Sequence, residues 1–160
     1  MAQYAILAVS NLDPGLVLAP ERYDPRRTTK SLNGIPLGEI VEIINDDATM
    51  HNVHALPKAN QEFNKMEQVK GARLTHVFTV PEVMVRFKCD VHSWMAAYGG
   101  VMPHPFFAVT TADGAFSLTG IPPGKYELAV WTEKLGSSTQ SIEIGNSQAV
   151  SLNFALAPKK

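Results

Sequence analysis

The amino-acid sequence predicts an all-β protein folded as a sandwich of short strands. Two observations support this prediction. Short apolar stretches follow one another along the whole chain, and clusters of glycine, proline, asparagine and aspartate separate them. In residues 83–89, apolar and polar side chains alternate, which is the pattern of a half-buried strand. About ten short strands separated by turn signals are typical of a β-sandwich or barrel.

The expected strands are distributed over the full length of the chain. They cover residues 4–9, 16–19, 39–45, 51–56, 74–80, 83–89, 106–110, 126–132, 141–144 and 149–156. Residues 21–38 are polar and rich in turn formers, so we expect a long surface loop with room for one edge strand. Residues 60–70 fit either a helix or a strand. Residues 96–105 contain two glycines and two prolines, and we expect a loop there.

Composition excludes several classes of function. The net charge is −1 and no basic run is present, which argues against nucleic-acid binding. A single cysteine excludes an internal disulfide, a zinc site with several cysteines and a cysteine-ligated iron–sulfur cluster. No apolar run approaches the roughly 20 residues of a membrane helix, so no membrane span is expected.

The most informative stretch is KCDVHSWM, residues 88–95. It contains Cys89, the only cysteine of the chain, followed by His92 and Met95 at intervals of three residues. A thiolate, an imidazole and a thioether form a soft ligand set, and soft sulfur ligands select copper. Two histidines and one cysteine with a weak axial methionine are the blue-copper electron-transfer pattern. The sequence therefore predicts a copper site that needs one more histidine.

The stretch TMHNVHA, residues 49–55, offers two candidates for the missing histidine. His51 and His54 stand three positions apart on a predicted strand. Residues at this spacing point to opposite faces of a strand, so one metal ion cannot readily bind both unless the strand bends. Spacing alone leaves open which of the two faces the Cys89 loop.

These two stretches together resemble the cupredoxins, the type 1 copper proteins. HNVH on a strand and the short Cys-x2-His-x2-Met loop are most similar to amicyanin, with plastocyanin as a relative that has a longer loop. The resemblance covers about residues 39–110 and implies a Greek-key β-sandwich that binds one copper ion per chain. It also implies that His51, Cys89 and His92 are the equatorial ligands and that Met95 is the axial ligand. Asn52 is implied to link the two stretches by hydrogen bonds.

The rest of the chain departs from that pattern. Residues 96–105 form a longer segment than the resemblance leads us to expect. This segment contains Met102 and His104, which are alternative ligands, and His54 is a third alternative. Residues 112–160 resemble the carboxypeptidase-regulatory or transthyretin-like β motif. We therefore expect a copper-binding domain over residues 1–111. Residues 112–160 are expected to form a C-terminal β extension packed on the same sandwich, with one composite domain as the alternative.

The expected function is electron transfer rather than catalysis. A cysteine nucleophile needs a base and an oxyanion hole, and no glycine-rich or helix-terminal donor accompanies Cys89 and His92. The alternative function is copper delivery, storage or sensing at a non-blue site.

The partner and the location follow from the same reading. A redox partner protein is expected to dock near His92 and Trp94. The expected location is periplasmic or extracellular, with the cytoplasm as the alternative. Residues 1–9 lack the basic region of an intact signal peptide, so export would require a leader that has been removed.

Overall fold

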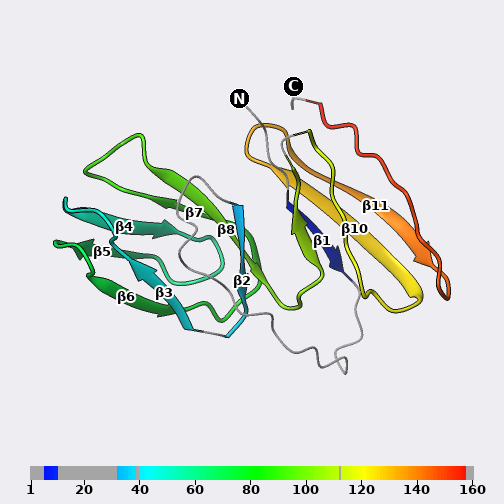
Figure 1. Cartoon of the computed structure of the whole chain (residues 1–160), viewed down its shortest axis with the longest axis horizontal. Helices are drawn as coiled ribbons and strands as arrows, with labels where there is room; N and C mark the ends of the chain where they lie inside the picture. The colour runs from blue at the N-terminus through cyan, green and yellow to red at the C-terminus, as the bar shows by residue number, and fades with distance from the viewer. Residues whose placement is uncertain (1–5, 11–31, 39, 112, 158–160) are drawn as a thin grey trace. The chain divides into compact units, whose positions relative to one another are not determined.

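The computed structural model describes residues 6–10, 32–38, 40–111 and 113–157 (Figure 1). These residues form strands and turns, and none of them forms a helix able to cross a membrane. The strands are β1 (Ile6–Ser10), β2 (Leu32–Pro36), β3 (Ile40–Ile44), β4 (His51–Leu56), β5 (Phe63–Glu67), β6 (Arg73–Val77), β7 (Glu82–Lys88), β8 (Ala96–Met102), β9 (Phe107–Val109), β10 (Gly124–Thr132) and β11 (Gly136–Ile144). The predicted all-β class is confirmed, and the strand expected at residues 16–19 lies outside the described residues.

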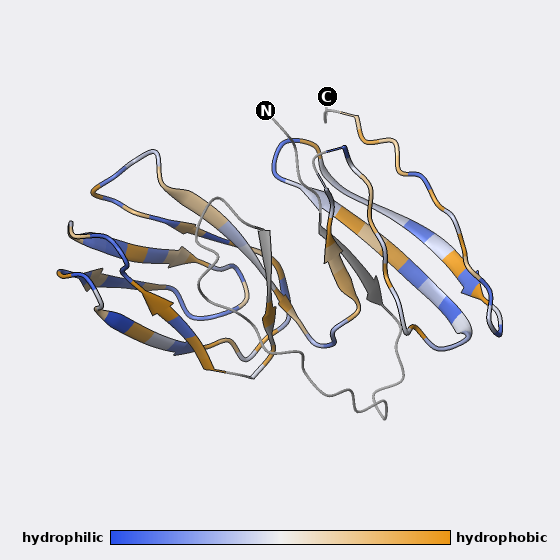
Figure 2. Ribbon diagram, viewed as in Figure 1, coloured by the Kyte–Doolittle hydropathy of each residue, from blue (hydrophilic) through white to orange (hydrophobic). Residues whose placement is uncertain are grey.

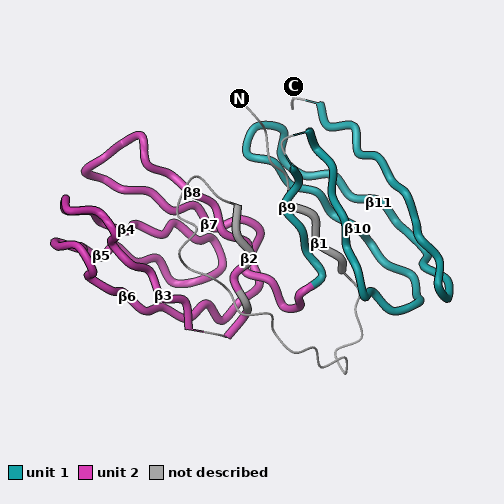
Figure 3. The backbone as a smooth tube through the Cα atoms, viewed as in Figure 1, with its two compact units in different colours: residues 1–19, 106–160 teal, residues 20–105 magenta. Residues whose placement is uncertain are grey.

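The chain forms two compact units (Figure 3). Residues 20–105 form one unit, and residues 1–19 together with 106–160 form the other. Strand β1 belongs to the unit of residues 1–19 and 106–160 because it pairs with β9 and β10. The expected division into residues 1–111 and 112–160 stays a prediction.

The unit of residues 20–105 is a two-layered β-sandwich. One layer is a five-stranded sheet in the order β2-β8-β7-β4-β5, and the other is the antiparallel pair β3-β6. The core between them takes Val41 from β3 and Phe78 from the segment after β6, together with Ala55, Val85 and Val101 from the larger sheet. Since both layers contribute buried side chains, burial of apolar surface holds them together.

Strand β8 corrects the expectation that residues 96–105 form a loop. Residues 96–102 are an interior strand of the larger sheet, antiparallel to β7 and parallel to the edge strand β2. Its glycines serve packing rather than a turn. A Cβ atom at Gly99 would lie 2.7 Å from Ile35 Cδ1 and 3.0 Å from Phe87 Cε2, so only glycine leaves room for these side chains. Strand β2 is the edge strand for which residues 21–38 had room.

A register shift in β7 interrupts its predicted alternation. The pairing of β7 with β8 is irregular between Glu82 and Val85. Val83 is therefore 53% exposed instead of sharing the buried face of Val85 and Cys89. Glu82 is buried in its place and accepts hydrogen bonds from the backbone N–H groups of Lys58 and Ala59. The segment left open between helix and strand contains strand β5.

The unit of residues 1–19 and 106–160 contains the four-stranded antiparallel sheet β11-β10-β1-β9. Burial alternates from residue to residue along β10 and β11. In Figure 2 the beginning of β10 is hydrophilic and a hydrophobic stretch follows it. The apolar face of β10, with Tyr126, Leu128 and Val130, packs against Phe106 in a separate core. The strand predicted at residues 149–156 is wrong, because the structure assigns no strand there. Leu152, Phe154 and Leu156 nevertheless pack against this core, which explains their strand-like alternation in the sequence.

Candidate metal centre

The pairing of β4 with β7 brings the two ligand-bearing stretches together. The strands are antiparallel neighbours, so the beginning of β4 lies at the same end of the sheet as the end of β7. His51 is the first residue of β4, and Cys89 directly follows β7. The chain then turns back into β8. The N–H of Met95 donates to the carbonyl of His92 at 2.9 Å, and the N–H of Cys89 donates to the carbonyl of Met95 at 3.2 Å.

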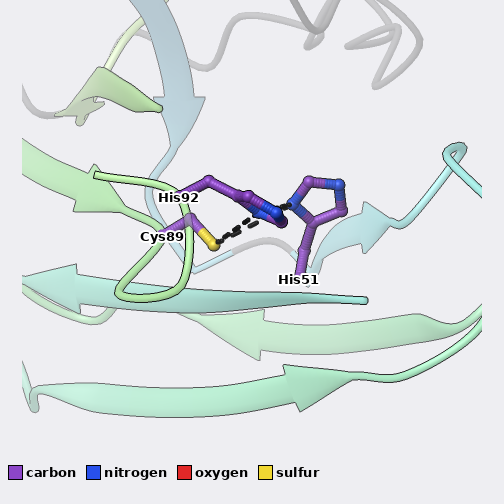
Figure 4. Close-up of side chains that lie close together, drawn as sticks. All are labelled: His51, Cys89 and His92. Atoms are coloured by element: carbon purple, nitrogen blue, oxygen red, sulfur yellow. Dashed lines mark hydrogen bonds between the residues drawn. The ribbon is translucent and has the colours of Figure 1, made fainter. Parts of the chain in front are cut away.

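Three side chains converge at this end of the sheet, as Figure 4 shows. Cys89 Sγ lies 3.9 Å from His51 Nδ1 and 3.6 Å from His92 Nδ1, and the two Nδ1 atoms are 3.1 Å apart. The sulfur of Cys89 points toward both imidazole rings. Among the described residues, these three form the one group of at least three histidine, cysteine, aspartate or glutamate residues whose ligand atoms lie close enough together to hold a metal ion.

The dimensions of this triangle fit a metal ion. A triangle with these sides has its centre about 2 Å from each corner, close to the roughly 2.0–2.3 Å bonds that zinc makes to imidazole nitrogen and thiolate sulfur. The donors are also chemically suitable, because one thiolate and two imidazoles suit copper as well as zinc. The residues present can therefore hold a transition metal without rearrangement of the backbone.

The orientation of His51 is determined by a carboxylate. His51 Nε2 lies 3.0 Å from Asp47 Oδ2, and the N–H of Asp47 donates to Asn45 Oδ1 at 2.9 Å. With Nε2 engaged by a hydrogen-bond acceptor, Nδ1 is the nitrogen left for a metal. Metal-binding histidines commonly have such a partner, which sets the tautomer and the ring orientation. Asp47 belongs to the acidic turn that precedes the histidine, so the sequence contained this signal.

Asn52 links the two ligand-bearing segments, as the resemblance implied. Its Oδ1 accepts the backbone N–H of Asp90 at 2.7 Å and lies 3.3 Å from Cys89 Sγ. Its Nδ2 donates to Asp90 Oδ2 at 3.0 Å and to Asn64 Oδ1 at 2.7 Å. Asn52 is buried, so these bonds are protected from competition with water. They hold the residue after Cys89 against β4.

The environment of Cys89 favours the thiolate. Burial opposes ionisation, but hydrogen bonds from the backbone of Asn52, from the side chain of His51 and from the backbone and side chain of His92 outweigh it and lower the pKa of the thiol to about 6. In the same interaction, the hydrogen bond to Cys89 raises the pKa of His51, while burial acts in the opposite direction. A thiolate is the form that binds metals, so the site is prepared for a cation before one arrives.

The other predicted candidates lie in different places. Among the described residues, the metal-binding cluster includes neither His54 nor His104. His54 instead contacts Asp90 and Glu62. Met102 is buried within β8. The backbone of Met95 closes the turn through its hydrogen bonds with His92 and Cys89, and Met95 is 38% exposed.

An aromatic side chain flanks His92. The rings of His92 and Trp94 lie 5.2 Å apart between centroids, and Trp94 is 73% exposed. Val91 and Met95 in the same turn are also exposed. The turn therefore presents apolar side chains to solvent beside a half-buried imidazole.

Comparisons with known proteins give one likeness to a solved structure. No protein-family model and no curated protein sequence matches the chain. A structure described as a novel purple cupredoxin from Nitrosopumilus maritimus is 28% identical over 44% of this chain and 77% of that chain, with a TM-score of 0.38. At so low a TM-score we base the function on the geometry of the site itself.

Proposed function

We propose that this protein binds one copper ion per chain and transfers electrons. The observation that carries the proposal is the triangle of Cys89 Sγ and the Nδ1 atoms of His51 and His92, with a centre that suits a metal ion. Two histidines and one cysteine are the equatorial set of blue-copper electron-transfer sites. Bound copper supplies the one-electron change between Cu(II) and Cu(I).

The chain's own residues would keep the ligand geometry constant during that change. His51, Cys89 and His92 are the proposed equatorial ligands, and Met95 is the proposed weak axial ligand. Asp47 holds the ring of His51, and Asn52 holds the backbone after Cys89. A rigid ligand set moves little between oxidation states, which favours rapid transfer.

The proposed route for the electron is through His92. Its ring is half-buried and contacts Trp94, which is exposed, in a turn that also exposes Val91 and Met95. An exposed apolar patch is typical of a docking surface. We propose that a redox partner protein docks on these four residues and that the protein works in the periplasm or outside the cell.

Copper loading tests the proposal. Metal-free protein is titrated with Cu(II), and bound copper is measured by elemental analysis together with the visible absorption spectrum. We expect one copper per chain and an intense thiolate-to-copper band. Cys89→Ser should lose that band, and His51→Ala should lose or transform the site.

The other outcomes have definite meanings. Copper bound with one ion per chain but without the band would favour delivery, storage or sensing at a non-blue site. Failure to bind copper at the triangle, or a band that survives in Cys89→Ser, would overturn the proposal.

A further inference from the structure

His54 lies between two carboxylates, one at each nitrogen of its ring. Its Nδ1 is 2.9 Å from Asp90 Oδ2, and its Nε2 is 2.9 Å from Glu62 Oε1. Both distances are those of a good hydrogen bond. Glu62 precedes β5 and Asp90 follows β7, so the imidazole joins segments on both sides of β4.

Only the protonated ring can satisfy both contacts. A neutral imidazole carries one N–H, so one of its nitrogens would turn a lone pair toward a carboxylate. An imidazolium ion donates from both nitrogens, and each bond is then assisted by charge. Lys88, opposite His54 on β7, opposes this charge, but its Nζ pairs with Asp90 Oδ1 at 2.7 Å. In accordance with this geometry, the hydrogen bond to Glu62 raises the pKa of His54 despite some loss of solvation.

Asp90 connects this ring to the turn that carries the metal ligands. Its Oδ2 also accepts Asn64 Nδ2 at 2.8 Å and Asn52 Nδ2 at 3.0 Å. Its backbone N–H donates to Asn52 Oδ1, which lies beside Cys89 Sγ. A continuous series of contacts therefore runs from Glu62 through His54 and Asp90 to Cys89, the residue directly after β7.

We propose that His54 is a positioning residue: as an imidazolium ion it holds Asp90 and thereby keeps the turn of residues 89–95 closed. Loss of its proton removes one of the two bonds and loosens the turn. This role rests on the proposed function only in that the turn carries the proposed ligands. The positioning itself belongs to the metal-free protein and is tested there.

The first experiment follows the protonation of the ring. Nitrogen NMR of the metal-free protein, titrated with pH, should show both ring nitrogens of His54 protonated up to a midpoint above the ordinary histidine value of about 6.5. Glu62→Gln should lower that midpoint. Glu42→Gln is the matched control, because it removes a carboxylate from a comparable contact, the one with Arg73 at 2.7 Å. A midpoint at or below the ordinary value would overturn the proposal.

The second experiment measures how often the turn opens. Cys89 is 5% exposed, so alkylation of the metal-free protein requires opening of its surroundings. His54→Gln keeps a polar side chain without a charge and should accelerate labelling roughly three- to tenfold, the range for one or two partly exposed charge pairs. Glu62→Gln should give a smaller acceleration, and Glu42→Gln none. An unchanged labelling rate in His54→Gln would refute the role.

The pH profile separates positioning from a general loss of stability. The ratio of the labelling rate of His54→Gln to that of the unchanged protein removes the shared pH dependence of the thiolate. That ratio should be high at acidic pH and fall toward one as pH rises through the midpoint of His54. A ratio that stays high at all pH values would mean that the ring acts by packing alone, against the proposal.

The two proposals fail in different ways. If the protein does not bind copper but labelling still depends on the protonation of His54, the proposed function falls and the positioning role stands. If copper binds with an intense band but the labelling rate does not depend on His54, the proposed function stands and the positioning role falls.

Discussion

Asn52 shows how one side chain outside the candidate metal-binding cluster can organise its surroundings. Its two polar atoms contact Asp90, and its Oδ1 also lies beside Cys89 Sγ. A buried asparagine that made fewer bonds would cost folding free energy, because its polar atoms have left water. The chain therefore gains both stability and a defined position for its single cysteine from the same contacts.

The metal-free protein should contain an unusually acidic thiol. Ultraviolet absorbance of the thiolate, titrated with pH, should give a midpoint near the pKa of about 6 for Cys89, against about 8.5 for an ordinary cysteine. His51→Ala removes one of the hydrogen bonds that stabilise the thiolate, so the midpoint should rise. Cys89→Ser, which has no thiol, is the control and should show no such transition. A midpoint at the ordinary value would contradict the geometry of the cluster.

The same shift predicts how stability depends on pH. Because the folded state lowers the pKa of Cys89, ionisation of the thiol favours folding. This contribution is fully present above the unfolded value of about 8.5 and is lost as pH falls through about 6. Urea denaturation of the metal-free protein should therefore show a greater loss of stability over this interval than Cys89→Ser does. Parallel curves for the two proteins would contradict this.

Met95 should adjust the copper site rather than create it. An axial thioether forms a long, weak bond, so Met95→Leu should still bind copper. Its reduction potential should rise, because the thioether no longer stabilises the oxidised ion. Voltammetry of the copper-loaded variant measures this. Met66→Leu, which changes an exposed methionine on β5, is the matched control. An unchanged potential would direct attention to Met102 or His104 as the axial ligand.

At the scale of elements, three neighbouring strands build the site. Strands β4, β7 and β8 lie side by side in one sheet, with β7 antiparallel to both of its neighbours. The beginning of β4, the end of β7 and the beginning of β8 therefore meet at one end of the sheet. Rigid strands on both sides of the turn of residues 89–95 limit its freedom, which is the arrangement that a fixed ligand set requires.

Gly99 is predicted to be indispensable to this arrangement. In Gly99→Ala the new methyl group would collide with Ile35 of β2 and with the ring of Phe87, which would have to shift. Overpacking of this kind costs about 1–3 kcal/mol of folding free energy. Gly145→Ala is the control, since its Cβ meets only the flexible amide end of Gln148. Urea denaturation of both variants measures the difference. Equal stabilities of Gly99→Ala and Gly145→Ala would contradict this prediction, because they would show that β2 can shift at little cost in folding free energy.

At the scale of the whole molecule, the chain divides its apolar residues between two separate cores. One core contains Phe78 and Val85, and the other contains Phe106 and Leu128. All three members of the metal-binding cluster belong to the unit of residues 20–105. Each unit thus has the means to bury its own apolar surface.

Damage to the second core should therefore leave the metal centre intact. Leu128→Ala removes a buried side chain and should cost that unit about 2–5 kcal/mol. In a Trp94→Phe background the remaining tryptophan, Trp131 on β10, reports unfolding of the unit of residues 1–19 and 106–160 by fluorescence. Labelling of Cys89 reports unfolding of the unit of residues 20–105 and should keep its rate. A parallel acceleration of labelling would mean that the two units unfold as one.

The sequence by itself determined which donor types the candidate site contains. The donor types and their spacing in residues 88–95 are local properties of the chain, and they predicted a soft ligand set without any knowledge of the fold. Strand class was predictable for the same reason, because alternation and turn residues act over a few positions. The predictions for residues 96–102 and 149–156 were wrong where local signals misled. Glycines in β8 leave room for neighbouring side chains, and the C-terminal segment alternates because it covers a core.

Only the tertiary structure decided which histidine lies beside Cys89. His51 and His54 are the same residue type in one short stretch, so the local sequence does not distinguish them. The choice depends on where the end of β7 meets β4, which is a long-range pairing. The same pairing brings Asp90 to His54, a contact that no local pattern in the sequence predicts. Side-chain chemistry is carried by each residue alone, whereas adjacency across a sheet arises from the pairing of segments that are distant along the chain. Local sequence patterns therefore identified the ligand types, and the fold selected their partners.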